Sequence, residues 1–256
     1  MSKNMAMEMM KERMRELGLT FMADGLDSFL HEQSGKDKTL AETLNELIEL
    51  EYYPRKERMA KTRLKVSGMP AVKRLEDYDL SWLNGGLTVK KLNELKTLSF
   101  IERQENIVLL GPSGTGKTHL LLSFGYKACM SGFTAYYISC ADLMDTLNKA
   151  KITGRLQKKI NWLKKPNLLL IDEVGYENLN TQEANLFFQV VNARYEKGAM
   201  IITTNKSFSK WGEIMNDDAI ATATLDRLLH HSHVLALNGD SYRMKDKLKV
   251  GLNLNS

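Results

Sequence analysis

The pattern of apolar and polar positions changes once along the chain, near residue 80. Before that point, apolar residues recur every three or four positions, which is the spacing of one face of an α-helix. The first such segment has its apolar positions at Met10, Met14, Leu17, Phe21 and Met22. A polar break, "SGKDK", follows it. We therefore expect residues 1–80 to form a small all-α domain.

A second helical segment is expected to begin at Thr39. Thr39 is a good N-cap, and Glu42 three residues later completes the pattern of a capping box. Pro54 should kink or end this helix, because proline lacks the backbone donor and its ring clashes with the preceding turn. The stretch "RKERMAKTRLK" follows the proline. The helical domain is therefore predicted to contain a strongly basic stretch after Pro54.

The pattern from residue 105 onward is typical of a parallel sheet covered by helices. Short apolar runs, "NIVLL", "FTAYYIS", "NLLLIDEV", "AMIITTN" and "HVLALNG", alternate with helical stretches. The runs are nearly unbroken and rich in Ile, Val, Leu and Tyr, as expected of strands that are buried on both faces. This alternation predicts an α/β fold, with a central parallel sheet between two layers of helices. We assign residues 81–256 to this second domain.

The loop after the first apolar run, "GPSGTGKT", fits the pattern G-x-x-x-x-G-K-[ST]. Its glycines allow left-handed backbone angles that bring several N–H groups to one point, and the following helix adds its positive N-terminal end. Lys117 would reach the outer phosphates of a nucleotide, and the hydroxyl of Thr118 would bind Mg²⁺. The predicted nucleotide site comprises Gly111, Pro112, Ser113, Gly114, Thr115, Gly116, Lys117, Thr118 and His119.

Two acids, Asp172 and Glu173, stand at the end of the run "NLLLIDEV". An open α/β sheet binds its ligand at the carboxyl ends of its strands. Asp172 suits Mg²⁺, through a coordinated water, and Glu173 suits a general base for the water that attacks the γ-phosphate. The alternative is a surface acid pair in a turn. A glutamate directly after the aspartate favours ATP hydrolysis over simple nucleotide sensing.

Three further side chains are candidates for the same chemistry. Asn205 ends the run "AMIITTN" and could orient the attacking water if its strand neighbours the strand of Asp172. Arg227 and Arg243 could neutralise the charge that develops during phosphoryl transfer. On the residues alone, a surface salt bridge with a nearby aspartate remains the better reading of each arginine.

Other polar residues carry weaker signals. Arg194 is a lesser candidate for the same role as Arg227 and Arg243. His230, His231 and His233 lie close together, but no cysteine or acidic residue stands at a fitting spacing, so the sequence does not favour a metal site there.

Taken together, these stretches resemble the AAA+ ATPases, and specifically the IstB-like transposition helper proteins of bacterial insertion sequences. The resemblance is carried by "GPSGTGKTHL", "LLLIDEVGYENL" and "LTFMADGLDSFL", and above all by the tail "TTNKSFSKWGEIMNDDAIATATLDRLLHHSHVLALNGDSYR". It implies a P-loop AAA+ domain with three αβα layers. The chain ends about a dozen residues after Arg243, which leaves no room for a C-terminal lid domain and also suits this family.

The resemblance also implies roles for the polar residues. Asn205 would be the sensor asparagine, Arg227 the finger that acts on an adjacent subunit, and Arg243 the second sensor arginine. The protein would assemble on ATP as an open ring or spiral, bind double-stranded DNA with little sequence preference, and engage a partner transposase.

Two alternatives remain. Helicase loaders of the DnaC and DnaI type share the "SYR" ending. In such a loader, ATP would act mainly as a binding switch, and the N-terminal helices would grip a replicative helicase. A small-molecule kinase is disfavoured by "LIDEV" and by the lack of an evident acceptor site.

The charge balance permits a nucleic-acid partner: 36 Lys and Arg against 31 Asp and Glu give a net charge of +5. Contacts to phosphates need basic side chains on one surface, although a charge run is as often only a solvated face. In related initiator ATPases, an extra helix before the strand that carries the acid pair faces DNA. This feature favours the second of the two basic runs given next. The candidates are Arg55, Lys56, Arg58, Lys61, Arg63 and Lys65, and then Lys149, Lys151, Arg155, Lys158 and Lys159.

The remaining features indicate a cytoplasmic protein. Cys129 and Cys140 stand in apolar surroundings that suit buried, reduced thiols. No apolar run reaches the ~18 residues of a membrane span, and the charged, Met-rich N-terminus is unlike a signal peptide.

Overall fold

The computed structural model describes residues 3–80 and 86–239. The chain divides into two compact units, with the boundary between Thr62 and Arg63. This boundary lies earlier than the expected one at residues 80 and 81, because the residues after 62 belong to the sheet-containing unit. There, the carbonyl of Ser67 accepts a hydrogen bond from Tyr137 N–H over 2.7 Å, and Leu75 is 3% exposed within the core.

The first unit is helical, as predicted, but its N-terminal segment is two helices rather than one. Gly18 has a left-handed φ of 75°, and the Leu19 N–H bonds back to the Met14 carbonyl over 2.8 Å, which closes the first helix. The helices are α1 (Lys3–Glu16), α2 (Thr20–Gln33) and α3 (Leu40–Val66), the last of which ends inside the second unit.

The predicted capping box opens α3. The Thr39 N–H donates to Glu42 Oε2 over 2.9 Å, and the Glu42 N–H donates back to Thr39 Oγ1 over 3.3 Å. The helix then continues through Pro54, so of the two predicted outcomes, a kink or an end, the end is wrong. One turn earlier α3 packs on α2, where the buried Glu51 carboxylate accepts the Met22 N–H over 3.1 Å.

The second unit contains the predicted parallel sheet. All five apolar runs form strands, and the strand order is β2-β3-β4-β1-β5, with every neighbouring pair parallel. β1 therefore lies in the interior of the sheet, between β4 and β5. The strands are β1 (Asn106–Leu110), β2 (Ala135–Ser139), β3 (Leu168–Val174), β4 (Ala199–Thr204) and β5 (Ser232–Ala236).

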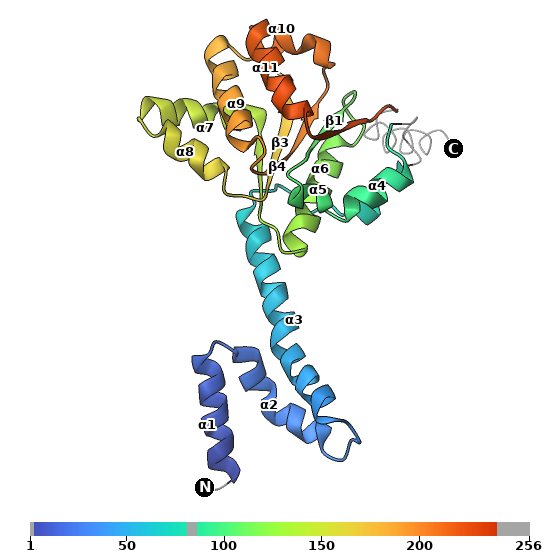
Figure 1. Ribbon diagram of the computed structural model, residues 1–256, viewed down its shortest axis with the longest axis vertical. Coiled ribbons are helices and arrows are strands. Elements are labelled where there is room, and N and C mark those ends of the chain that lie inside the picture. Colours follow the sequence, from blue (N-terminus) through green and yellow to red (C-terminus); the bar gives the residue numbers. More distant parts are fainter. Residues whose placement is uncertain (1–2, 81–85, 240–256) are drawn as a thin grey trace, which may run out of the picture. The chain divides into compact units, whose positions relative to one another are not determined.

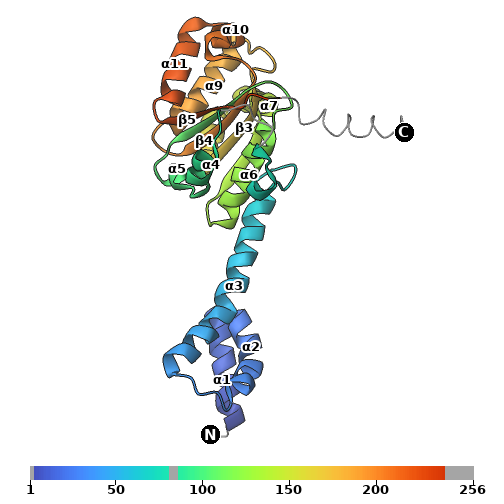
Figure 2. The same ribbon diagram turned by 90° about the vertical axis from the view of Figure 1, so that its right-hand side faces the viewer.

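Helices cover both faces of this sheet, which gives three layers (Figures 1 and 2). Alternate strand residues serve the two faces: Ile107 and Leu109 belong to one apolar cluster, and Val108 belongs to the other. The first cluster includes residues of α4 (Val89–Lys96), α5 (Ser99–Glu102) and α6 (Lys117–Met130). The second includes residues of α7 (Cys140–Ile152), α8 (Leu156–Leu163), α9 (Thr181–Arg194), α10 (Trp211–Met215) and α11 (Asp218–Leu229).

Two other expectations concern this unit. Cys129 and Cys140 are free and buried, as predicted. Within residues 3–80 and 86–239, no helix has the length and apolar character needed to cross a membrane. The predicted lack of a lid domain concerns residues near the C-terminus that lie outside the described ranges.

Candidate nucleotide-binding site

The glycine-rich loop connects the carboxyl end of β1 to the start of α6. Gly114 and Gly116 have φ values of 87° and 85°, in the left-handed region that glycine tolerates. A Cβ atom at Gly116 would also lie 2.9 Å from the ring of Tyr78. Glycine is therefore required at Gly116 for two reasons: the backbone is left-handed, and a side chain there would clash with Tyr78.

Lys117 lies along the inside of this loop. Its Nζ donates hydrogen bonds to the carbonyls of Gly111 and Pro112, each over 2.7 Å. Thr115 Oγ1 donates to the Pro112 carbonyl over 2.9 Å and braces the same turn. The ammonium group thus stands beside the amino end of α6, where both the charge and the helix dipole favour an anion.

Asp172, on β3, is 2% exposed and is held by three hydroxyl groups. Thr118 Oγ1 donates to its Oδ1 over 3.1 Å, and Thr203 Oγ1 donates to the same atom over 2.5 Å. Tyr137 donates to Oδ2 over 3.3 Å. Burial, together with the charge of Asp172, raises the pKa of Tyr137, so its hydroxyl stays a donor. A carboxylate and a threonine hydroxyl in contact form a hard oxygen donor set that fits Mg²⁺.

Glu173 adopts an unusual backbone conformation. Its φ of 62° is left-handed, and the pairing of β3 with β4 shifts register between Ile171 and Val174. The Glu173 N–H donates to Thr203 Oγ1 over 2.8 Å. A bulge of this kind re-aims a side chain: Glu173 is exposed, whereas its neighbours Asp172 and Val174 are buried. A left-handed non-glycine residue costs about 1–3 kcal/mol, and such strain concentrates at functional sites.

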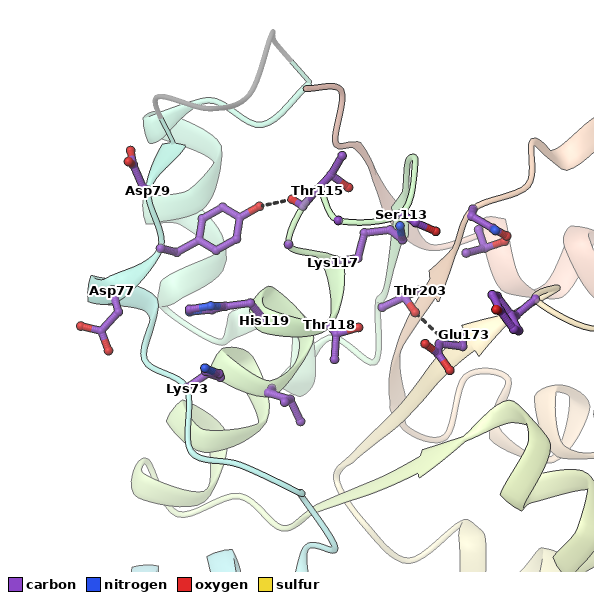
Figure 3. A pocket seen from close by; sticks show the side chains of 17 residues that line it. Lys73, Asp77, Asp79, Ser113, Thr115, Lys117, Thr118, His119, Glu173 and Thr203 are labelled. Carbon is purple, nitrogen blue, oxygen red and sulfur yellow. Dashed lines mark hydrogen bonds between the residues drawn. The ribbon is translucent and has the colours of Figure 1, made fainter. Parts of the chain in front are cut away.

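One cavity of about 620 Å³ brings the predicted residues together (Figure 3). Its lining includes Ser113 to His119, together with Glu173 and Asn205. Asn205 follows β4, which pairs with β3, so the strand adjacency that its predicted role requires is present. Most of the loop, Glu173 and Asn205 thus share one cavity at the C-terminal ends of the strands. Asp172 does not line the cavity but contacts it through Thr118.

A further wall of this cavity was not predicted from the sequence. It consists of residues in the segment between α3 and α4, and Tyr78 is its centre. The Tyr78 hydroxyl donates to the Thr115 carbonyl over 3.2 Å, and its ring meets the His119 ring edge to face, with centroids 5.5 Å apart. Burial raises the pKa of Tyr78 to about 12, so the hydroxyl remains a donor at neutral pH. The wall is formed by Lys73, Asp77, Tyr78 and Asp79.

The three candidate arginines fall in different places. Arg227, on α11, does not line the cavity. Its Nε donates to Asn192 Oδ1 over 2.8 Å, and its guanidinium lies 4.9 Å from the Phe188 ring centroid. Arg243 lies outside the described residues.

Arg194 has a structural role instead of the suggested catalytic one. It is 1% exposed, and its guanidinium donates to four backbone carbonyls, with distances from 2.7 to 3.3 Å. Burial lowers its pKa to about 10, so it stays charged at neutral pH. The acceptors are the carbonyls of Leu163, Pro166, Asn167 and Ala199.

The two basic runs differ in how far their charges are already engaged. In the α3 run, Lys61 pairs with Glu57 over 2.6 Å, and Arg63 Nε donates to the Cys129 carbonyl over 2.9 Å. In the α7–α8 run, Lys159 packs 4.3 Å from the Trp162 ring centroid. Within the part of the chain that the structure describes, no member of the α7–α8 run makes a salt bridge: Lys149, Lys151, Arg155, Lys158 and Lys159.

A parallel sheet with β1 between β4 and β5, a glycine-rich loop after β1, and an acid pair at the end of β3 define a P-loop protein of the AAA+ class. The fold is similar to that of DnaI, whose crystal structure superposes with a TM-score of 0.54 at 16% identity over 65% of this chain and 91% of that one. The model of the IstB-like ATP binding protein family matches residues 12–250. The chain belongs to this family.

Individual members of the family are similar to nearly the whole chain. The insertion sequence IS5376 ATP-binding protein of Geobacillus stearothermophilus is 41% identical over 93% of this chain and 96% of its own length. The insertion sequence IS21 ATP-binding protein of Pseudomonas aeruginosa is 42% identical over 89% of this chain and 85% of its own length.

Proposed function

We propose that this chain is a Mg²⁺-dependent ATPase that serves as the helper protein of an IS21-type insertion sequence. In this function it assembles on target DNA and engages the transposase of the same element. The names of its relatives support the link to insertion sequences and to ATP. The observation that carries the chemistry is the 3.1 Å contact between Asp172 and Thr118, because Thr118 lines the same cavity as Glu173.

The cavity offers different surroundings to the phosphates and to the base of ATP. The backbone N–H groups from Ser113 to Gly116, with Lys117, would hold the triphosphate. Tyr78 and His119 form an aromatic wall beside the loop, against which a base can pack. Burial lowers the pKa of His119, which favours the neutral ring on this wall.

Thr118 and Asp172 would hold Mg²⁺, which neutralises phosphate charge when bound. Glu173 accepts a proton from a water molecule as that water attacks the γ-phosphorus, and the bond from the γ-phosphorus to the bridging oxygen breaks. Asn205 positions the water from the neighbouring strand. Thr203 holds the Glu173 backbone and the Asp172 carboxylate in one arrangement, so it is a positioning residue.

The place of Arg227 supports a shared site between subunits. Its guanidinium is partly exposed on α11, does not line this chain's cavity, and bonds to the neutral side chain of Asn192. We propose that it reaches the nucleotide of an adjacent subunit in an ATP-dependent ring or spiral. Arg243 is proposed as the second sensor on the basis of the family pattern alone.

The α7–α8 run is the better candidate for DNA. None of its five basic groups forms a salt bridge within the described ranges, so they need not give up an ionic partner to bind phosphate. Affinity for duplex DNA should then fall steeply with salt and vary little with sequence. The α3 run, with Lys61 and Arg63 already engaged, is the second candidate.

The test is an ATPase assay of the full chain with and without random duplex DNA, followed by electron microscopy of the assemblies. Lys117→Ala should abolish ATP binding and turnover, whereas Lys127→Ala, on the same helix, should not. Normal ATP affinity in Lys117→Ala would remove the loop assignment. A pull-down with the full chain should capture the transposase of an IS21-type element, and capture of a replicative helicase instead would favour a loader.

A further inference from the structure

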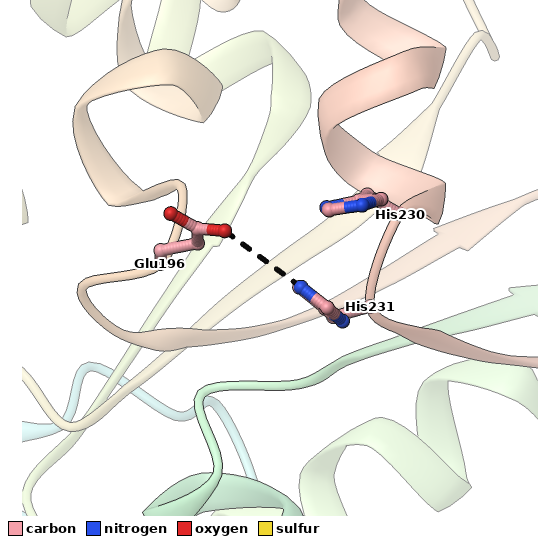
Figure 4. A group of neighbouring side chains, drawn as sticks. All are labelled: Glu196, His230 and His231. Atoms are coloured by element: carbon pink, nitrogen blue, oxygen red, sulfur yellow. Dashed lines mark ion pairs between the residues drawn. The ribbon is translucent and has the colours of Figure 1, made fainter.

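Two histidines and a glutamate gather near the N-terminal ends of β4 and β5 (Figure 4), whereas the nucleotide cavity lies at the C-terminal ends of the strands. Glu196 lies in the turn after α9, His230 follows the last residue of α11, and His231 precedes β5. One ligand atom from each of the three lies within 4.8 Å of the other two. The His231 carbonyl accepts the Asn106 N–H over 2.7 Å, which fixes this stretch to the first residue of β1.

The spacing of the three side chains is close to that of a tetrahedral metal site. His231 Nε2 lies 3.7 Å from Glu196 Oε1, and the centroids of the two imidazole rings are 4.1 Å apart. Zinc bonds of about 2.0–2.1 Å place tetrahedral ligands about 3.3 Å from one another. All three side chains are exposed, so small rotations can close the remaining gap and a metal ion can reach them from solvent.

A neighbouring tyrosine orients one of the two rings. The hydroxyl of Tyr195 lies 2.7 Å from Nδ1 of His230, within hydrogen-bonding distance. Metal-binding histidines usually bond through their second ring nitrogen to a polar group, which fixes the ring and its tautomer. With Nδ1–H donating to the tyrosine oxygen, Nε2 of His230 carries the lone pair for a metal.

We propose that Glu196, His230 and His231 form a binding site for Zn²⁺, with Tyr195 as the residue that positions His230. Two imidazole nitrogens, one carboxylate oxygen and an open fourth position match the donor set and geometry of zinc, whereas Mg²⁺ prefers six oxygen ligands. The bound ion joins the turn after α9 to the junction of α11 and β5. The same two helices are also joined by the hydrogen bond from Arg227, on α11, to Asn192, on α9.

The sequence hides this site because its acidic ligand is remote. The stretch "HHSH" contains no acid at a suitable spacing, and the sequence therefore did not favour a metal there. Folding places Glu196 beside the histidines, because β4, which follows it, and β5 both pair with β1. His233 is not a member of the group, since its Nε2 lies 2.9 Å from Glu105 Oε2.

The test uses the full chain without a polyhistidine tag, stripped of metal and titrated with ZnCl₂ in the presence of excess MgCl₂. Wild-type protein should bind one zinc per chain and unfold at a higher temperature with zinc than without it. His230→Ala, His231→Ala and Glu196→Gln should each weaken zinc binding by more than tenfold, and Tyr195→Phe by about 10- to 100-fold. Each variant should keep wild-type ATP binding, which shows that it has folded.

The matched control is His233→Ala, which removes a histidine of the same stretch that pairs with Glu105. It should bind zinc as wild-type protein does. The proposal is overturned if wild-type protein takes up less than one equivalent, or if His231→Ala binds zinc with unchanged affinity. Uptake of half an equivalent with formation of a dimer would also overturn it, in favour of a site between two copies.

Discussion

The hydroxyl of Thr203 donates a hydrogen bond to Oδ1 of Asp172 over 2.5 Å. Oγ1 of Thr203 also accepts the backbone N–H of Glu173 over 2.8 Å, so one threonine on β4 contacts both acids of β3. This contact explains how a strained, left-handed glutamate stays in place beside a buried carboxylate. Thr203 is therefore a residue of β4 that contacts both members of the acid pair.

Removal of the Thr203 hydroxyl is expected to slow hydrolysis more than it weakens binding. Thr203→Val keeps the shape of the side chain but leaves the Glu173 N–H and one bond to Asp172 unmet, which costs about 1–3 kcal/mol of folding stability. We expect a fall in kcat of at least tenfold with little change in ATP affinity, measured by steady-state turnover and nucleotide titration. Thr224→Val is the control, because that buried hydroxyl donates only to the Ile220 carbonyl. Equal losses in both variants would assign the effect to general destabilisation.

Glu173→Gln should separate ATP binding from ATP turnover. The amide cannot accept a proton from the attacking water, and a general base contributes about 10²- to 10⁴-fold to such a reaction. We expect normal ATP affinity, a loss of turnover of that size, and DNA complexes that persist in ATP. Glu177→Gln, an exposed neighbour outside the cavity lining, should behave as wild type. Rapid turnover by Glu173→Gln would exclude Glu173 as the base.

Arg227→Ala should bind ATP but fail to hydrolyse it. The reason is that Arg227 lies outside this chain's cavity and is proposed to complete the site of a neighbour. Mixing Arg227→Ala with Lys117→Ala protein should restore part of the turnover, because a subunit with an intact loop can then meet an intact arginine. Arg103→Ala, which removes an arginine paired with Glu105, serves as the control. Absence of rescue at every mixing ratio would contradict a role between subunits.

Neutralisation of the α7–α8 run should weaken DNA binding through salt-dependent contacts. Each lost phosphate contact lowers the slope of log affinity against log salt by about 0.9, so loss of three should lower it by about 2.7. The variant is Lys151→Ala, Arg155→Ala and Lys158→Ala together, which spares Lys159 on its tryptophan.

The matched triple variant on α3 changes Arg55, Lys56 and Arg58 to alanine. Fluorescence anisotropy with a random duplex, over a range of salt concentrations, compares the two. A larger change of slope in the α3 variant would move the DNA surface to that helix.

Local sequence patterns were sufficient for the strands and for the nucleotide loop. Leu168 to Ile171 form an apolar run that only a strand covered on both faces can bury. The run places Asp172 toward the C-terminal end of β3, where the site lies. The loop from Gly111 is read from its own residues, since its conformation depends on glycines inside it. These features were predictable because cause and effect lie within a few residues of each other.

Features that depend on distant residues were not predictable in this way. The two hydrogen bonds that Thr203 makes with Asp172 and Glu173 require β4 to lie beside β3. The left-handed conformation of Glu173 occurs where that pairing shifts register. Tyr78 reaches the loop only because its segment packs against α6, and nothing in its own sequence marks it. Pro54 was expected by a local rule to kink or end α3, but the helix continues through it, in a region where Glu51 makes a tertiary bond to Met22.

The wall centred on Tyr78 has a consequence for communication along the chain. The segment that carries it begins where α3 ends, so a short stretch of backbone separates the last turn of that helix from Tyr78, whose hydroxyl bonds to the Thr115 carbonyl of the loop. A nucleotide that packs against Tyr78 would restrain this stretch, and a macromolecule bound to α3 would act on the same stretch. By thermodynamic reciprocity, any factor by which ATP changed the affinity of the helical unit for the proposed partner would be the factor by which that partner changed the affinity for ATP.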